Sequence, residues 1–149
     1  MEARAPKLTP HLSSVRDFMH AIPFNRELGI IVVDIEPGTV TLEIPFRDAL
    51  IGDPSRPALH GGVISSIMDT AGGAAVWTAI GVSDRCSTID LRVDYLLPGR
   101  AAALRAEARV LRVGNKVGVT TIRCYHPDRP EETVAEGKGV YSVKRVDDK

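Results

Sequence analysis

The stretch HGGVISSIMDTAGGAAVWTAI, residues 60–80, decides the fold of this 149-residue chain, because it is the longest apolar run in the sequence. From Gly61 to Ile80 the residues are apolar almost all round a helix, and such a helix is enclosed by protein on most sides. One charged residue, Asp69, stands within it. An aspartate at the centre of a bilayer costs about 2.5–3.5 kcal/mol, so residues 61–80 are interpreted as a buried helix and not as a membrane span.

Strand patterns surround this helix in the sequence. Six runs are rich in β-branched residues or alternate apolar with polar residues, and Pro37-Gly38, Pro98-Gly99 and Gly114-Asn115 are turn signals at their ends. The runs are Leu28–Glu36, Thr39–Phe46, Ser87–Leu97, Ala101–Val113, Lys116–His126 and Glu132–Arg145. This order predicts two strands, the long helix and then four more strands.

Two other segments complete the chain. Thr9 as an N-cap and Pro10 as the first helical residue begin an amphipathic helix that continues to Ile22. Arg47–Leu59 contains two prolines, a glycine and two aspartates, so we expect a loop there.

The fold class follows from the question of which helix can cover the inner face of the predicted sheet. Only the helix from Gly61 is long enough to cover the inner face of the sheet, so the sheet must curl around it. We predict an α+β domain in which an antiparallel sheet of about five to six strands wraps around a long central helix. Residues 1–26 are expected to form an N-terminal segment and helix that pack on the domain proper, residues 27–146.

Composition narrows the choice of partners. Nineteen basic and nineteen acidic side chains cancel, so no overall field would hold a nucleic acid or an anionic membrane, and neither partner is expected. The N-terminus lacks the apolar core of a signal peptide, which favours the cytoplasm. Cys86 and Cys124 are therefore expected to be reduced, partly buried thiols, and their spacing fits no metal site.

Asp69 is the first candidate for a catalytic residue. Because the rest of its helix is apolar, its carboxylate is expected in a partly desolvated place, where an unpartnered charge is unfavourable. Such places are often functional sites. The alternative is a structural carboxylate that forms an ion pair or caps a helix.

The start of the same helix is the second candidate. Gly61 and Gly62 leave backbone N–H groups uncovered at the positive end of the helix dipole, and an oxyanion hole can be built in this way. His60 either hydrogen-bonds a neighbouring carbonyl at the helix entry or holds the glycine loop in place. Further along, Ala71–Ala75 would let a strand, a second helix or an acyl chain approach the backbone closely, and tight packing alone explains the run equally well.

Leu59–Gly62, Asp69–Ala71 and Ser87–Pro98, at this spacing, resemble the hot-dog-fold thioesterases of the phenylacetic acid degradation type, in the 4-hydroxybenzoyl-CoA thioesterase superfamily. The similarity extends from about Gly29 to Val143. It implies the hot-dog fold and hydrolysis of an acyl- or aryl-coenzyme A thioester to a free acid and coenzyme A. No cofactor is implied beyond the coenzyme A that the substrate carries.

The resemblance also implies roles for the catalytic candidates. An acidic residue at the Asp69 position acts as general base or nucleophile, and the backbone N–H at the Gly61 position polarises the thioester carbonyl. Thr88 matches a Ser/Thr position that helps to hold the attacking water. His60 and Gly62 complete the predicted site.

Other positions depart from the family pattern or extend it. Many relatives have an asparagine about six residues ahead of the motif histidine, where this chain has Pro54, and Asp53 is the candidate replacement. Coenzyme A phosphates in such enzymes meet basic residues near a strand turn. Here that turn offers Arg112, Asn115 and Lys116, for each of which an ordinary solvated turn is the competing interpretation.

The spacing of Gly61 and Asp69 predicts an assembly. Eight residues of one helix span about 12 Å, whereas a base and an oxyanion donor must both lie about 3 Å from one reacting centre. One helix cannot supply both groups. We therefore expect Gly61 of one subunit to face Asp69 of another in a homodimer, or in a homotetramer built from such dimers.

The predicted function is acyl-CoA thioester hydrolysis, and two alternatives stay open. A non-catalytic acyl-CoA-binding protein would keep the glycines and would not require Asp69. A hot-dog hydratase or dehydratase would need an acid–base pair arranged about the acyl β-carbon, and the sequence has no such pairing.

Overall fold

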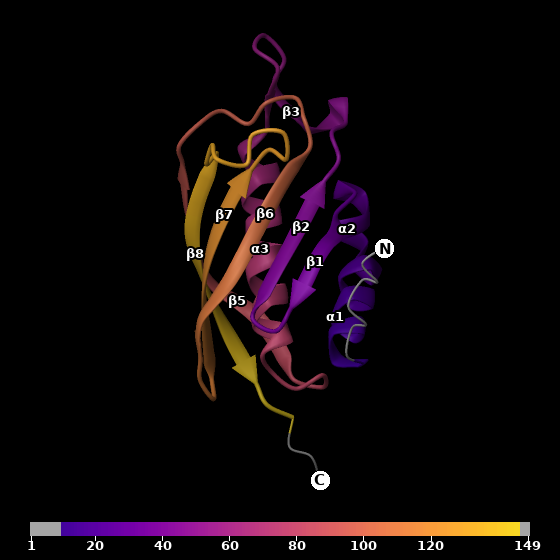
Figure 1. The fold of residues 1–149 in the computed structure, drawn as a ribbon, viewed down its shortest axis with the longest axis vertical. Coiled ribbons are helices and arrows are strands. Elements are labelled where there is room, and N and C mark those ends of the chain that lie inside the picture. Colours follow the sequence, from indigo (N-terminus) through magenta and orange to yellow (C-terminus); the bar gives the residue numbers. More distant parts are fainter. Residues whose placement is uncertain (1–9, 147–149) are drawn as a thin grey trace, which may run out of the picture.

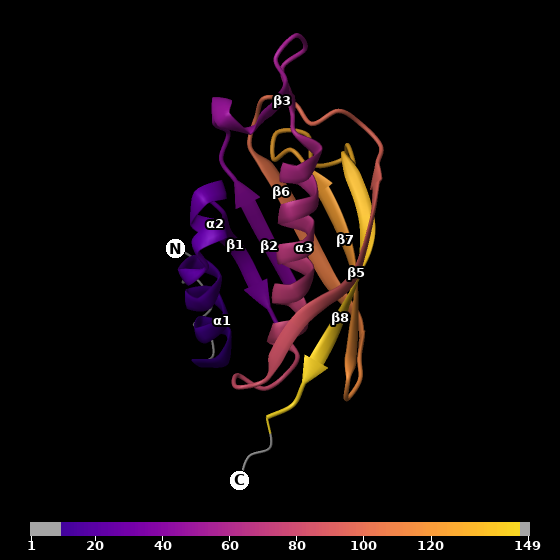
Figure 2. The same cartoon turned by 180° about the vertical axis from the view of Figure 1, so that it is seen from behind.

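The computed structural model describes residues 10–146 and has two layers, an antiparallel sheet and a long helix that lies in its concave face (Figures 1 and 2). The sheet has six strands in the order β1-β2-β6-β7-β8-β5. Their bounds are β1 Ile31–Glu36, β2 Thr39–Ile44, β5 Arg85–Tyr95, β6 Leu104–Val113, β7 Val117–Tyr125 and β8 Ala135–Lys144. The predicted fold class and all six predicted strands are confirmed. Three of the strands, β1, β6 and β8, each begin three residues later than expected, and in β8 this is because Glu132 lies in the turn that precedes the strand.

The central helix, α3, runs from Gly61 to Thr78, two residues short of the predicted end. Its buried side chains pack against the inner face of the sheet, where Val40, Leu42 and Ile44 of β2 are almost completely inaccessible. One stripe of α3 is only half-buried, however, and this stripe contains Asp69, Gly73 and Trp77. The expectation of a helix enclosed on most sides therefore holds except along this stripe.

The N-terminal segment differs from the prediction of a single helix. The predicted single helix is two helices, α1 Pro10–Ala21 and α2 Pro23–Leu28, so Leu28 ends a helix and does not begin a strand. The break has a local cause: proline disfavours helical backbone at the preceding residue, and Ile22 is extended, with φ −66° and ψ 121°. Gly29 then ends α2 in the left-handed conformation, with φ 73°. The predicted N-cap, Thr9, lies outside the described residues.

Residues 47–59 also have more structure than the predicted loop. A 3₁₀ turn, η1 Asp48–Leu50, leads into a small hairpin of β3 Ile51–Asp53 and β4 Ala58–Leu59. The backbone N–H of His60 donates to the carbonyl of Leu50 across 2.9 Å. The segment thus brings the chain back to the start of α3 in a fixed position.

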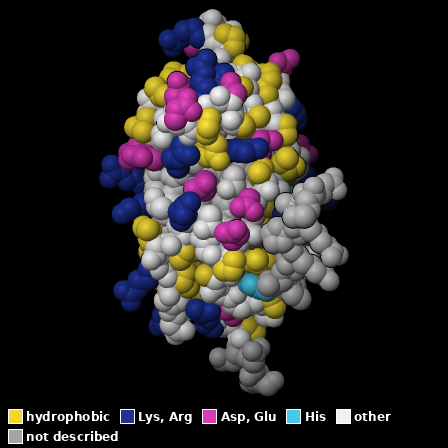
Figure 3. Space-filling model, in the orientation of Figure 1, with side chains coloured by type: hydrophobic (Ala, Val, Ile, Leu, Met, Phe, Trp, Pro, Cys, Tyr) yellow, Lys and Arg dark blue, Asp and Glu magenta, His cyan; other side chains and the backbone are white. Residues whose placement is uncertain are grey.

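The outer face of the sheet is charged. In Figure 3, acidic and basic side chains are interspersed over this face. Some pair across or along strands, as Arg105 does with Glu43 at 2.9 Å and Arg109 with Glu107 at 3.1 Å. The sheet therefore has one dry face and one wet face, as its period-2 patterns predict.

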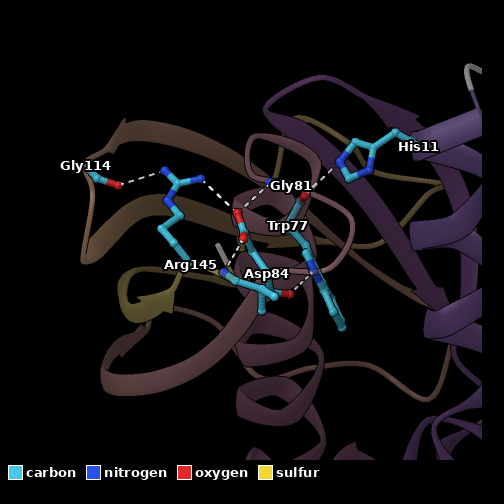
Figure 4. A network of polar contacts seen from close by, with 7 residues as sticks. His11, Trp77, Gly81, Asp84, Gly114 and Arg145 are labelled. Carbon is cyan, nitrogen blue, oxygen red and sulfur yellow. Dashed lines mark hydrogen bonds and ion pairs between the residues drawn. The ribbon is translucent and has the colours of Figure 1, made fainter. Parts of the chain in front are cut away.

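A polar network holds the end of α3 to the rest of the fold (Figure 4). The Asp84 carboxylate accepts from the backbone N–H groups of Gly81 and Val146 and forms an ion pair with Arg145 at 2.9 Å. These donors hold the pKa of Asp84 below its ordinary value of 3.8, and the N–H of Val146 is the largest cause. The carbonyl of Asp84 accepts from the indole of Trp77 across 3.0 Å. None of the helices within residues 10–146 is both long and apolar enough to span a membrane.

Candidate active site

Asp69 lies in the middle of α3 and faces away from the centre of the sheet, with a half-buried side chain. The hydroxyl of Thr88, on edge strand β5, donates to its Oδ1 across 2.7 Å. Asp69 takes part in no ion pair within the described chain, and it stands well inside α3, away from any cap. The two structural roles weighed for it, ion pairing and capping, are therefore not seen within residues 10–146.

Tyr141 fixes the backbone beside this carboxylate. Its hydroxyl donates to the carbonyl oxygen of Asp69 across 2.9 Å, and its ring fills the space beside Gly72. Burial raises the pKa of Tyr141, and the charge of Asp69 adds to the shift. The phenol therefore stays neutral at physiological pH and serves as a fixed donor. Tyr141 could not be identified from the sequence, because nothing in a strand pattern distinguishes it from a core aromatic residue.

A pocket of about 300 Å³ opens beside the Asp69–Thr88 pair. Its wall on one side comes from α1 and α2, and its floor comes from α3 and the start of β5. The lining residues are Phe18, Met19, Ile22, Phe24, Asn25, Asp69, Thr70, Gly73, Trp77, Cys86, Ser87, Thr88 and Tyr141. The accessible surface of the pocket is mostly apolar, and Asp69 and Thr88, with their neighbours Thr70 and Ser87, add polar groups to it. A mostly apolar lining with a few polar groups is the usual make-up of a site for a small organic ligand.

Cys86 lies in this pocket and has a half-buried thiol. Burial raises its pKa to about 11, and the nearby charge of Asp69 contributes to the rise. Cys124 is fully buried in the core, and burial raises its pKa to about 12. Cys86 is partly buried as expected, whereas Cys124 is fully buried. Both thiols are protonated and therefore poor nucleophiles near neutral pH.

The start of α3 forms a second polar feature. His60 is the N-cap, and its Nδ1 accepts from the N–H of Gly62 across 2.8 Å. The ring thus holds the glycine loop, and the N–H of Gly62 is occupied. The N–H of Gly61 has no hydrogen-bond partner within residues 10–146, so Gly61 keeps a free donor at the positive end of the helix dipole.

Tyr95, at the end of β5, completes this end of α3. Its hydroxyl donates to the carbonyl of Gly61 across 3.3 Å, and its ring is 53% exposed. In the sequence, Tyr95 is marked only as part of an alternating strand pattern. Its contact with Gly61 joins residues 34 positions apart and is visible only in the tertiary structure.

The structure does not bring all the predicted residues together. Asp53 sits in the β3–β4 hairpin, where its Oδ1 accepts from the hydroxyl and the backbone N–H of Ser55 at 2.5 and 3.0 Å. The Ser55 hydroxyl is the main cause that lowers its pKa. Asp53 thus stabilises its own turn. Arg112, Asn115 and Lys116 are exposed around the β6–β7 turn. This turn lies near the C-terminal end of α3, whereas Gly61 lies at its N-terminal end (Figure 1).

A larger depression lies on the outer face of the sheet. It has a volume of about 420 Å³ and is lined by Arg92, Asp94, Thr121, Glu136, Gly137 and Lys138. Its charges of both signs and its distance from Asp69 make it a poorer candidate than the smaller pocket. Within residues 10–146 no group of three or more His, Cys, Asp or Glu side chains is placed to hold a metal ion.

Comparisons with known proteins point to one family. The sequence pattern described as the thioesterase superfamily matches residues 57–133. A Halobacterium salinarum protein named as a candidate esterase is 39% identical over 127 residues, which cover 80% of this chain and 83% of that protein. YigI of Salmonella typhimurium, named a medium/long-chain acyl-CoA thioesterase, is 35% identical over 125 residues, 75% of this chain and 81% of YigI.

Solved structures agree with the sequence relatives. The structure of a thioesterase family protein from Silicibacter pomeroyi superposes with a TM-score of 0.84 at 25% identity, covering 91% of this chain and 99% of that one. A Pseudomonas aeruginosa protein superposes with a TM-score of 0.79 at 30% identity, covering 92% of this chain and all of that one.

Proposed function

Since the chain belongs to the thioesterase superfamily, we propose that it hydrolyses an acyl-coenzyme A thioester and that Asp69 is the catalytic carboxylate. The observation that carries the proposal is the hydrogen bond from Thr88 to Asp69 in the lining of a mostly apolar pocket. The YigI relatives, named as medium/long-chain acyl-CoA thioesterases, support the choice of substrate class.

Because of the hydrogen bond from the Thr88 hydroxyl, the two carboxylate oxygens of Asp69 have different roles. Because Oδ1 accepts from Thr88, Oδ2 is left to receive a proton from water. The water oxygen then forms a bond to the thioester carbonyl carbon, and the tetrahedral intermediate collapses as the carbon–sulfur bond breaks. The proton held by Asp69 passes to the departing thiolate, which gives coenzyme A and a free acid. Direct attack by Asp69 to form a mixed anhydride is the other route open to the same carboxylate.

Gly61 supplies the second half of the proposed site from a neighbouring subunit. Its free N–H and Asp69 stand about 12 Å apart along one helix, too far to act on one carbonyl. We propose a homodimer in which the Gly61 N–H of one chain polarises the carbonyl that Asp69 of the other chain serves, with a homotetramer as a further step of assembly. The uncovered edge of β5, which also carries Thr88, is a suitable surface for such a contact.

The role of His60 within this proposal is positional. By accepting from the N–H of Gly62, it fixes the loop that presents the N–H of Gly61. Arg112, Asn115 and Lys116 remain the proposed contacts for coenzyme A phosphates, and membership of the phenylacetic acid degradation type remains a proposal that rests on the motif resemblance.

A direct test is release of free thiol from a panel of short, long and aromatic acyl-coenzyme A substrates. We expect turnover without added metal or redox cofactor. A well-folded protein that binds acyl-coenzyme A and releases no thiol from any of these substrates would instead support the non-catalytic binding protein.

A further inference from the structure

The half-buried stripe of α3 leads from the catalytic carboxylate into the apolar pocket. Asp69, Gly73 and Trp77 are spaced four residues apart, so they lie on one face of the helix, and all three line the pocket. Gly73 has no side chain, and at this position the surface of the helix is its bare backbone. The stripe therefore forms a shallow groove with a carboxylate at one end and an indole at the other.

Two aromatic side chains, Phe18 and Trp77, stand at the far end of the groove and are held in place by their neighbours. The ring of Phe18, on α1, meets Trp77 edge-on at 4.3 Å between centroids. The indole N–H is fixed by the carbonyl of Asp84 at 3.0 Å. His11 of α1 contacts the carbonyl of Trp77 at 3.1 Å, so α1 is anchored to α3 at this point (Figure 4). Phe18 and Trp77 thus form the end wall, and their contacts fix the position of both rings.

The side wall belongs to the N-terminal helices, which are fixed by other residues. Leu12, Val15 and Met19 anchor α1 in the core, and the buried amide of Asn25 donates to the carbonyl of Met19 across 2.9 Å, joining α2 to α1. Phe18 and Phe24 nevertheless remain 46% and 55% exposed. Large apolar side chains that stay accessible inside a pocket are suited to bind an apolar ligand.

We infer that the Asp69–Gly73–Trp77 groove, walled by α1 and α2, binds the acyl chain and limits its length, and that the preferred substrates carry an acyl group of medium length. This inference rests on the proposed function. From Asp69 to Trp77 the helix rises about 12 Å. A chain of 1.5 Å bonds with tetrahedral angles advances about 1.25 Å per bond, so the groove holds about eight to ten carbons. The Phe18–Trp77 pair stops longer chains.

Substitution of Gly73 by alanine tests the inference. A Cβ added at Gly73 would lie 3.4 Å from Tyr141 Cε1, an ordinary contact. Gly73→Ala should therefore fold at least as well as the wild type, because alanine favours a helix by about 1 kcal/mol over glycine. The added methyl would fill the groove about 6 Å from Asp69, beyond the reach of a short chain.

The experiment measures kcat/KM for saturated acyl-coenzyme A substrates from butanoyl to hexadecanoyl. For the wild type we expect a maximum near octanoyl and decanoyl. Gly73→Ala should lower the value for decanoyl at least about tenfold and leave butanoyl within about twofold. Phe18→Ala, which trims a half-exposed side chain, should move the maximum to longer chains. Leu111→Ala, at a residue outside the pocket that is 55% exposed against 46% for Phe18, is the matched control and should leave the profile unchanged.

Failure of this inference is distinct from failure of the proposed function. An active wild type whose profile is unchanged in both Gly73→Ala and Phe18→Ala would overturn the groove and leave thioester hydrolysis standing. An equal loss at every chain length in a folded Gly73→Ala protein would also overturn it. A wild type that hydrolyses no acyl-coenzyme A would refute the proposed function, and the groove with it.

Discussion

The hydroxyl of Thr88 lies 2.7 Å from a carboxylate oxygen of Asp69, and this hydrogen bond joins edge strand β5 to the middle of α3. The two residues are 19 positions apart and belong to different layers of the fold. The contact holds the carboxylate at the rim of the apolar pocket in one orientation. It also places the proposed base next to the strand edge that a second subunit would meet.

Asp69→Asn tests the carboxylate itself. The amide oxygen can still accept from Thr88, so we expect the melting temperature to stay near that of the wild type. Without a group that accepts a proton, kcat should fall by about 10²–10⁴-fold. Turnover and thermal melting are measured on the same preparation, with Asp34→Asn, an exposed position on β1, as the matched control. Near wild-type turnover in folded Asp69→Asn protein would contradict the mechanism.

Thr88 is tested by a pair of substitutions. Thr88→Val keeps the shape and removes the donor, whereas Thr88→Ser keeps the donor. A hydrogen bond to a charged group contributes about 1.5–3 kcal/mol, and solvent at the rim reduces this, so we expect Thr88→Val to lower kcat about tenfold. Thr88→Ser should retain most of the activity. Equal losses in both variants would show that the methyl group matters and not the hydroxyl.

Gly61→Pro removes the proposed oxyanion donor with little disturbance of the fold. Proline is well tolerated at the first position of a helix, and His60 already has the extended conformation favoured before proline, with φ −61° and ψ 133°. We expect kcat to fall about 10²–10³-fold. Gly61→Ala, whose Cβ would lie 3.6 Å from the Tyr95 ring, keeps the N–H and serves as the control.

The two-chain site gives Gly61→Pro and Asp69→Asn a joint test. A mixed dimer contains one site with both defects and one site with neither, so it should recover about half of wild-type turnover. Co-expressed chains with two different tags allow the mixed dimer to be purified and assayed. If it stays as inactive as each parent, the site is contained in one chain, and a monomer in light scattering would agree with that result.

Gly72→Ala should destabilise the protein, in contrast to the neighbouring Gly73→Ala. A Cβ at Gly72 would overlap the Tyr141 hydroxyl and lie 2.8 Å from its ring carbon Cζ. Overpacking of this kind costs about 1–3 kcal/mol, and the melting temperature should fall by roughly 2–12 °C. Differential scanning calorimetry of both variants checks the contrast. A Gly72→Ala protein as stable as Gly73→Ala would mean that Tyr141 can move aside.

The Asp84 network predicts a pH dependence of stability. The folded pKa of Asp84 is held below 3.8, so its contribution is complete above that value and is lost as the pH falls through the folded pKa. The stability difference between the wild type and Asp84→Asn should therefore be constant near neutrality and shrink in acid. Urea unfolding at pH 7 and pH 3 measures it. A difference that grows in acid would refute the network as drawn in Figure 4.

The sequence by itself determined the helix, the strands and the catalytic candidates. An apolar run such as residues 60–80 is typical of a buried helix, and period-2 runs are typical of strands in a sheet with one wet face. Asp69 and Gly61 stood out by residue type and position, whereas the role of Thr88 was implied by the family resemblance. Turn chemistry was also local: Pro23 breaks the first helix because its ring acts on the preceding residue, a signal that was present in the sequence although the prediction missed it.

Only the tertiary structure decided what those residues face. Helical periodicity makes the adjacent residues Gly72 and Gly73 point about 100° apart, but it does not say what each one faces. Gly72 contacts Tyr141 closely and Gly73 opens into the pocket, because the position of β8 relative to α3 is set by packing over the whole core. The pocket wall from α1 and α2, the Tyr95–Gly61 contact and the Asp84 network each join residues distant in the sequence. Local periodicity fixes which residues share a face of an element, whereas the partner of that face depends on how all the elements pack together.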